Sequence, residues 1–213
     1  MKIRKISALI LSLAIIVGIT ACDKKESTSN TGLYIEPAVL TQQEENILNL
    51  VNSANRPNLI ADFNLDDSVK SVEITVYRLV DGQWKPESKS RQELEGSRGR
   101  FSFSFKRLSE GFRTAFQSKN NNGSTEHSIP YENMTEEQKA LAKMSVGSTM
   151  LSNQTKVEYE KEIPIVLQVI TEKNEVRLTL DGFENPEEYE KMDYNAVYAV
   201  TIMFSQKEIN DMA

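Results

Sequence analysis

Five oxygen-bearing side chains have the spacing of a twelve-residue calcium-binding loop. Counting from the first of them, they fall at positions one, three, five, seven and twelve: Asp62, Asn64, Asp66, Ser68 and Glu73. Position six is Asp67 instead of the glycine that the sharp turn requires, and Phe63 and Leu65 alternate with polar residues as in a strand. We therefore favour a solvated strand edge at this stretch, with calcium binding as the alternative, and predict no cofactor.

Nucleophilic hydrolysis lacks the residues that it needs. A serine or cysteine nucleophile requires a neighbouring base, and the one histidine, His127, lies in the Asn- and Gly-containing segment 120–128, which we predict to be a loop. A single cysteine excludes Cys/His zinc sites and dithiol redox chemistry. A glycosidase with two catalytic acids stays open, because its carboxylates need not be close in sequence and the chain has 31 acids. We predict that the protein is not an enzyme and name no catalytic residue.

Residues 1–21 have the three-part layout of a secretory signal peptide. A basic start with Lys2, Arg4 and Lys5 precedes the apolar stretch 6–19, and small residues follow at Thr20 and Ala21. A transmembrane helix is the alternative. Residues 6–19 would span only about 21 Å of a hydrocarbon core that is about 30 Å thick, so the signal peptide is the better interpretation.

The end of this leader resembles the lipobox of bacterial lipoproteins, in which an aliphatic and two small residues precede a cysteine: Ile19, Thr20, Ala21 and Cys22. The resemblance implies cleavage between Ala21 and Cys22 and a diacylglyceryl group on the Cys22 sulfur. Two acyl chains hold a protein on a membrane stably, whereas one gives only marginal binding. An ordinary signal peptide followed by a chance cysteine is the alternative.

The charge that remains after residues 1–21 are removed narrows the choice of partners. The 22 remaining Lys and Arg residues against 31 Asp and Glu give a net charge of −9. Phosphate contacts need clustered cations, so we predict no nucleic-acid partner. An anionic membrane surface would repel such a chain, which leaves the lipid as the predicted membrane attachment.

Periodicity predicts helices only as short elements. Residues 22–33 comprise the lipidated cysteine and a polar, flexible tether. An N-terminal helix segment is predicted at 34–60. The helix within it starts at a capping box formed by Thr41 and Glu44 and carries an apolar stripe that we expect to pack on the main fold: Ile47, Leu48, Val51 and Ala54. Two further helices are predicted, one from the cap Thr135 to a stop at Gly147 and a one-turn helix after Asn185.

Alternating apolar residues predict about seven strands in residues 61–213. The main segments are 69–80, 100–105, 112–117, 162–171, 176–180 and 196–204, with a hairpin turn at Asp81-Gly82 and loops at 87–99, 120–128 and 148–155. Phe101, Phe103 and Phe105 share one strand face and are predicted to be core, not a binding platform, and Trp84 is predicted to pack across strands. The fold class is mainly β, an antiparallel β-sandwich of immunoglobulin-like architecture with short inserted helices.

Residues 63–206 also resemble uncharacterised lipoproteins of Gram-positive, clostridia-like bacteria. The resemblance lies in the segments 65–72 (LDDSVKSV), 159–164 (YEKEIP) and 198–201 (YAVT). It implies an envelope location and adds no catalytic residue.

The predicted function is therefore a membrane-anchored lipoprotein on the extracytoplasmic face of the cell membrane, held there by its lipid. It would bind or scaffold an envelope protein or polymer. The alternative is a small envelope hydrolase or its regulator, which would have a deep polar cleft with paired acids of raised pKa. The substrate-binding subunit of a transporter is disfavoured, because no repeated βα units occur.

Overall fold

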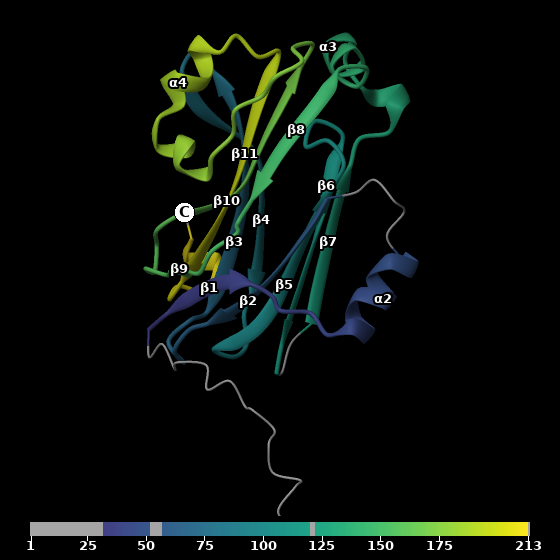
Figure 1. The fold of residues 1–213 in the computed structure, drawn as a ribbon. Coiled ribbons are helices and arrows are strands. Elements are labelled where there is room, and N and C mark those ends of the chain that lie inside the picture. Colours follow the sequence, from purple (N-terminus) through teal and green to yellow (C-terminus); the bar gives the residue numbers. More distant parts are fainter. Residues whose placement is uncertain (1–31, 52–56, 120–121, 213) are drawn as a thin grey trace, which may run out of the picture. The chain divides into compact units, whose positions relative to one another are not determined.

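Two antiparallel sheets carry the fold of this computed structural model, which describes residues 32–51, 57–119 and 122–212 (Figure 1). The larger sheet contains, in spatial order, β7 (Asn122–Ser128), β6 (Gly111–Ser118), β5 (Arg98–Phe105), β2 (Asn58–Asn64), β1 (Tyr34–Pro37) and β9 (Thr155–Lys156). The smaller sheet contains β4 (Gln83–Glu93), β3 (Ser71–Val80), β11 (Ala196–Ser205), β10 (Ile163–Thr171) and β8 (Ser145–Met150). The predicted antiparallel sandwich with short helices is confirmed, although the described residues form eleven strands and not about seven.

The main core lies between the two sheets and is built mainly from the inward-facing residues of β1, β2, β3, β5, β6, β10 and β11. On β5, Phe101, Phe103 and Phe105 are almost fully buried, and the ring of Phe63 on β2 lies 5.5 Å from that of Phe204 on β11. These residues belong to one apolar cluster with the inward side chains of β3 and β10. The prediction that the three phenylalanines of β5 are core is confirmed.

A buried glutamine links the two sheets at one end of this core. Gln168 on β10 has no exposed surface; its side-chain oxygen accepts the N–H of Leu108 (2.7 Å). Its nitrogen donates to the carbonyl oxygen of Lys106 (3.3 Å) and to the hydroxyl of Ser148 on β8 (3.1 Å). Both the oxygen and the nitrogen of the Gln168 side chain therefore have hydrogen-bond partners, so this buried residue leaves no polar side-chain atom unpaired.

The outer face of β10 and β11 is covered by a second apolar cluster, so β10 is buried on both faces as predicted. The cover consists of the segment around Leu178, a 3-10 helix, Leu180–Glu184, and α4 (Pro186–Lys191). Trp84 stacks on Phe183 with ring centroids 5.4 Å apart and donates its indole N–H to the Phe183 carbonyl oxygen (2.8 Å). Trp84 is therefore a packing residue, but these contacts are with the cover and not across strands as predicted. The strand predicted at 176–180 is wrong, because these residues contribute to the cover.

Three segments predicted as loops are strands at the edges of the sheets. Residues 87–93 continue β4, residues 122–128 form β7, and residues 145–150 form β8, which also contains Gly147, the predicted stop of a helix. β7 is exposed along nearly its whole length. An edge strand exposed on both faces needs no apolar alternation, since its pairing rests on the backbone ladder.

The hairpin predicted at Asp81-Gly82 is confirmed between β3 and β4. Both residues have positive φ angles, 51° at Asp81 and 68° at Gly82, as the favoured two-residue hairpin turn requires. Pro86 lies on β4, at the edge of the smaller sheet and beside a register shift, where its missing N–H interrupts no interior ladder.

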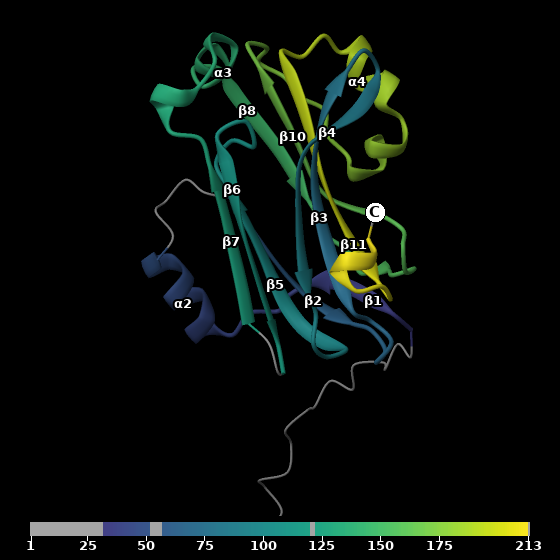
Figure 2. The same ribbon diagram turned by 180° about the vertical axis from the view of Figure 1, so that it is seen from behind.

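In the part of the chain that the structure describes, the helices are α2 (Gln42–Val51), α3 (Glu136–Leu141), α4 and three 3-10 segments: Tyr131–Asn133, Leu180–Glu184 and Ile209–Asp211. At α3 the predicted capping box is confirmed, because Thr135 accepts the N–H of Gln138 and the Gln138 side chain accepts that of Thr135. The predicted helix after Asn185 is also present, but the Asn185 side chain makes no capping hydrogen bond. Figures 1 and 2 show α3 and α4 at one end of the sandwich and α2 away from that end, beside the larger sheet.

Residues 34–60 contribute directly to the sandwich. β1 pairs with β2 on one side, from Tyr34↔Asn64 to Pro37↔Ala61, and with β9 on the other. Because α2 lies between β1 and β2 in the sequence, it is an insertion between two neighbouring strands of one sheet. Several predictions lie outside the described residues. They are the signal peptide, the Ala21–Cys22 cleavage site, the Cys22 lipid, all but the last residues of the tether, and Ala54 of the predicted stripe.

Candidate functional site

The five calcium candidates are divided between the two sheets. Asp62 and Asn64 lie on β2, Glu73 lies on β3, and Asp66 and Ser68 lie in the turn between these strands. Only the last two are brought together: the Ser68 N–H donates to the Asp66 carboxylate (2.9 Å), and so does the Ser68 hydroxyl. In the described ranges, no three His, Cys, Asp or Glu side chains gather as a metal site would require.

The other three calcium candidates are held by cationic side chains. Asp62 accepts two hydrogen bonds from Arg100, at 2.6 and 3.0 Å, and Asn64 accepts one from Arg98 (2.6 Å). Glu73 is paired with Lys89 and Arg91. Strand register explains these pairs, since Asp62 lies opposite Arg100 and Glu73 lies opposite Arg91 across neighbouring strands.

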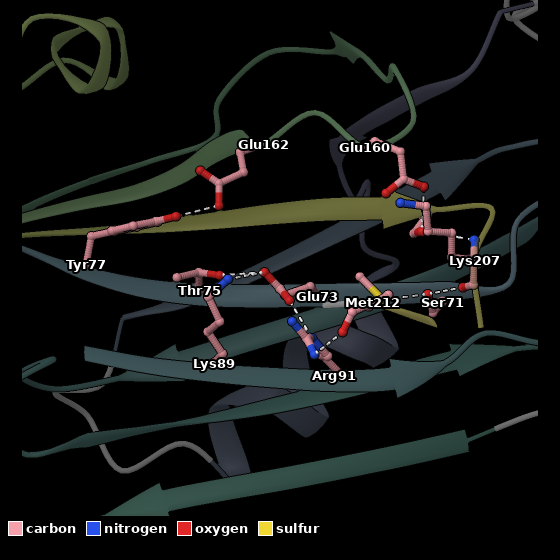
Figure 3. Close-up of polar contacts among 11 residues, drawn as sticks. Ser71, Glu73, Thr75, Tyr77, Lys89, Arg91, Glu160, Glu162, Lys207 and Met212 are labelled. Atoms are coloured by element: carbon pink, nitrogen blue, oxygen red, sulfur yellow. Dashed lines mark hydrogen bonds and ion pairs between the residues drawn. The ribbon is translucent and has the colours of Figure 1, made fainter. Parts of the chain in front are cut away.

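Glu73 is the centre of a polar network on the outer face of the smaller sheet (Figure 3). Its carboxylate is 3% exposed and accepts hydrogen bonds from Arg91 (2.6 Å), Lys89 (2.9 Å) and the Thr75 hydroxyl (3.1 Å). Burial by itself would raise the pKa of Glu73, but the hydrogen bonds from Arg91 and Lys89 outweigh it and lower the pKa. A carboxylate held ionised by two cations is suited to fixing β3 to β4, not to exchanging a proton.

Figure 3 shows further polar contacts along the strands on either side of Glu73. Tyr77 donates its hydroxyl to Glu162 (2.6 Å), and burial raises the pKa of Tyr77. Glu160, whose φ angle is +60°, accepts hydrogen bonds from the Ser205 hydroxyl (2.5 Å) and from the N–H of Gln206. Ser71 donates to the carbonyl oxygen of Lys207 (2.6 Å). Each of these groups is engaged by a neighbour, so we interpret the network as structural.

A second group of charges joins α3 to the smaller sheet. Arg78 on β3 forms an ion pair with Glu137 and lies 4.0 Å from Glu87. Burial raises the pKa of Glu87, whereas the hydrogen bond from Arg78 lowers the pKa of Glu137. A hydrolase with two acids was expected to show both in a deep cleft with raised pKa values. Here the acids flank a cation, and the Glu137 side chain is largely exposed.

His127 lies on the edge strand β7 and not in the predicted loop. Its ring packs against Phe112 on the neighbouring strand, with centroids 5.6 Å apart, and the residue is exposed. Phe112 and His127 are paired across β6 and β7, so the contact follows from the register. It supplies packing at the sheet edge.

Arg100 connects α2 to the outer face of the larger sheet. Beyond its two bonds to Asp62, its guanidinium donates to the Glu44 carboxylate (2.7 Å) in the first turn of α2. The hydrogen bonds with Asp62 raise the pKa of Arg100. At the start of the helix, Thr41 and Glu44 form the predicted capping box, with the Thr41 N–H donating to the Glu44 carboxylate (2.7 Å) and the Glu44 N–H to the Thr41 hydroxyl (3.3 Å).

A groove of about 470 Å³ opens beside α2; we call it the α2 groove. Its apolar walls come from Leu40 and Leu48 on the helix side, Leu59 and Ile60 of β2, and Met150 and Leu151 at the end of β8. Glu45 is its one charged lining residue among those described. The side-chain oxygen of Asn58, which also lines it, is buried and accepts no hydrogen bond from a described residue.

The apolar stripe predicted for α2 does not pack on the main fold as a whole. Ile47 is 59% exposed and Leu50 is 86% exposed, and the preceding Val39 is 89% exposed. Leu48 is partly buried and faces the groove. The prediction that this stripe is covered is wrong for Ile47, because helical spacing identifies an apolar face but not the surface that covers it. Exposed apolar residues beside an apolar groove are typical of an interaction site.

Replacing Arg100 with alanine is expected to loosen α2 without unfolding the sandwich. Loss of the link to Glu44 should speed hydrogen exchange of the α2 amides about fivefold, since a partly exposed ion pair contributes about 1 kcal/mol at most. Hydrogen exchange read by mass spectrometry measures this. Arg98→Ala is the matched control, because Arg98 is on the same strand and bonds to Asn64. Unchanged α2 exchange in Arg100→Ala would contradict the assignment.

Neither the partners of Glu73 nor the α2 groove was predicted from the sequence. Lys89 and Arg91 alternate in a segment that was predicted as loop; their spacing of two is the signal that could have placed them on one strand face. Nothing in the sequence indicates that Met150 and Leu40, far apart along the chain, line one groove.

Among the described residues, no helix is long and apolar enough to cross a membrane. The chain matches no protein-family model, no curated protein and no solved structure. The resemblance to lipoproteins of clostridia-like bacteria therefore stays a prediction.

Proposed function

We propose that this chain is a lipid-anchored protein on the extracytoplasmic face of a bacterial cell membrane, where it binds or scaffolds another component of the envelope and catalyses no reaction. The observation that carries the proposal is the leader: a basic start, an apolar stretch too short to span a bilayer, and Ile19-Thr20-Ala21 before Cys22. Two acyl chains on Cys22 would supply the attachment that a chain of net charge −9 cannot gain from an anionic surface.

A binding role is supported by the surface beside α2. Val39, Ile47 and Leu50 are exposed and are sequence neighbours of residues that line the apolar α2 groove, and exposed apolar residues near such a groove are typical of a binding surface. The tether from Asp23 to Gly32, treated as a flexible coil, would keep its ends about 15–20 Å apart. The folded part would therefore act close to the bilayer.

Replacing Cys22 with serine tests the anchor. Without the sulfur no diacylglyceryl group can be attached, so we expect the protein to leave the membrane fraction for the soluble fraction when cells are lysed and centrifuged. Ser27→Ala, in the tether, is the matched control and should stay with the membrane. If Cys22→Ser sediments with the membrane as the unchanged chain does, the lipid anchor is wrong.

A further inference from the structure

One sheet edge lacks the features that usually keep sheet edges from pairing. β8 is the last strand of the smaller sheet, and its residues, SVGSTM, include no charge and no proline. The opposite edge, β4, carries Lys85, Pro86, Lys89 and Arg91. Natural proteins protect edges with lysine, proline and bulges, so an unprotected edge stands ready to accept another strand.

No described strand pairs with the outer edge of β8, while the side chains of Val176 and Leu178 lie close to Gly147 in its middle. β8 pairs with β10 from Ser145↔Thr171 to Met150↔Val166, and no described strand lies on its other side. No other described backbone group forms a hydrogen bond with β8. Since alternate N–H and C=O groups of an antiparallel edge strand point away from its partner, those of β8 can pair with an added strand.

This open edge leads into apolar surface. Met150, the last residue of β8, lines the mainly apolar α2 groove. It also lines a second groove of about 490 Å³, whose lining is mainly polar and includes Asp181 and Glu184 beside Leu178 and Leu180. A strand added beside β8 would thus reach apolar walls at the Met150 end. Side chains that alternate along such a strand supply specificity, while its backbone supplies the pairing.

The charge of Glu45 indicates which kind of partner segment fits the α2 groove. Glu45 is the charged lining residue of the α2 groove, and no described ion pair neutralises it; its described contact is a hydrogen bond from the Gln42 amide (3.3 Å). α2 has two acids in its first turn and no basic residue in its last. A second copy of this chain would bring acid against acid, whereas a segment with Lys or Arg would pair with Glu45.

We propose that β8 and the α2 groove together receive an extended segment of an envelope protein, with alternating apolar residues and at least one Lys or Arg. The segment pairs through its backbone with the outer edge of β8, places apolar side chains against Met150, Leu48 and Ile60, and directs its cation to Glu45. This inference rests on the proposed role as a binding module and adds the class of partner.

Selection from a phage-displayed library of random twelve-residue peptides tests it, with the full chain in phosphatidylcholine nanodiscs as bait. We expect the enriched peptides to alternate apolar residues and to carry Lys or Arg. Synthetic copies should bind about tenfold more weakly to Val146→Lys, which puts a charge on the open edge, and to Glu45→Gln. Methylation of alternate peptide N–H groups should abolish binding, because it removes the donors of the added strand.

Two matched controls separate these effects from general changes in charge. Val80→Lys introduces the same cation at a valine of similar exposure, 39% against 36% for Val146, and Glu136→Gln removes an exposed acid from α3. Both should bind the peptides like the unchanged chain. The inference is overturned if no peptide is enriched, or if the enriched peptides bind Val146→Lys and Glu45→Gln undiminished.

Failure here and failure of the proposed function give different results. If Cys22→Ser leaves the membrane fraction but the unchanged chain enriches no peptide, the lipid anchor is supported and the proposed partner class is wrong. If Cys22→Ser still sediments with the membrane but the unchanged chain binds alternating basic peptides at β8, the lipid anchor is wrong and the binding site is supported.

Discussion

Replacing Phe103 with alanine is expected to lower the free energy of unfolding by about 3–5 kcal/mol, the usual cost of removing a large aromatic side chain from a core. Phe103 is fully buried on β5, and its ring lies 5.5 Å from Phe105 and 5.4 Å from Phe112. A cavity at this position removes contacts that both neighbouring rings make, and a close-packed interior fills it only in part. Urea denaturation followed by circular dichroism measures the loss.

The control for Phe103 is another aromatic residue outside the core. Tyr131 is exposed in the 3-10 segment before α3, so Tyr131→Ala should change stability by less than about 1 kcal/mol. The distinction matters because three phenylalanines in a row can also form a binding platform. If Phe103→Ala were as stable as Tyr131→Ala, the row on β5 would not be core.

Replacing Glu73 with glutamine is expected to cost about 2–3 kcal/mol at pH 7. Removing one partner of a fully buried ion pair costs about 3–5 kcal/mol, because the other charge stays buried and unpaired. We expect the smaller cost of about 2–3 kcal/mol here, because the side chains of Lys89 and Arg91 are 44% and 27% exposed and can reach water once Glu73 is replaced by a neutral residue. Glu136→Gln, an exposed acid paired with Lys139, should cost less than about 0.5 kcal/mol.

The dependence of stability on pH gives Glu73 a signature that a packing defect lacks. Its pKa is lowered in the folded protein from the usual 4.5, so the folded state gains from ionised Glu73 above pH 4.5. That gain is lost as the pH falls below 4.5 through the lowered pKa. The difference in unfolding free energy between the unchanged chain and Glu73→Gln should therefore shrink at acid pH. A difference that stays constant from pH 7 to pH 3 would contradict this account of Glu73.

The parts of the fold that the sequence predicted are those whose burial has a period. Phe101, Phe103 and Phe105 alternate because one face of β5 is core and the other is not, and β10 reads as continuously apolar because the sandwich covers one face and the α4 region the other. The Asp81-Gly82 hairpin and the Thr135 capping box were predictable because their geometry depends on residues next to one another.

The errors arise where neighbours in space decide the structure. β7 is mostly exposed and polar, and β8 is partly exposed with two large apolar residues that do not alternate. Backbone pairing holds both as strands, and neither has an apolar pattern from which a strand could be predicted. Residues 176–180 alternate like a strand, yet β10 already has β8 and β11 on its two sides, and the apolar residues cover the sheet face instead. Ile47 is apolar at helical spacing and still faces outward.

The candidate site was predictable only in its acids. The sequence predicted a solvated strand edge at Asp62 to Glu73, with calcium binding as the alternative. The solvated edge is wrong, because β2 and β3 are interior strands and Glu73 is buried. The strand register gives Asp62 and Glu73 each a cation on the neighbouring strand. Which cation lies opposite which acid depends on register, and register depends on the whole sheet. The α2 groove required the relative positions of β2, α2 and the end of β8, which no local pattern contains.

Mass spectrometry of the N-terminal peptide of the protein purified from bacterial membranes tests the lipid anchor most directly. We predict that this peptide begins at Cys22 and carries a diacylglyceryl group on the sulfur. A peptide that begins before Cys22, or a Cys22 with a free thiol, would contradict the proposed lipid attachment.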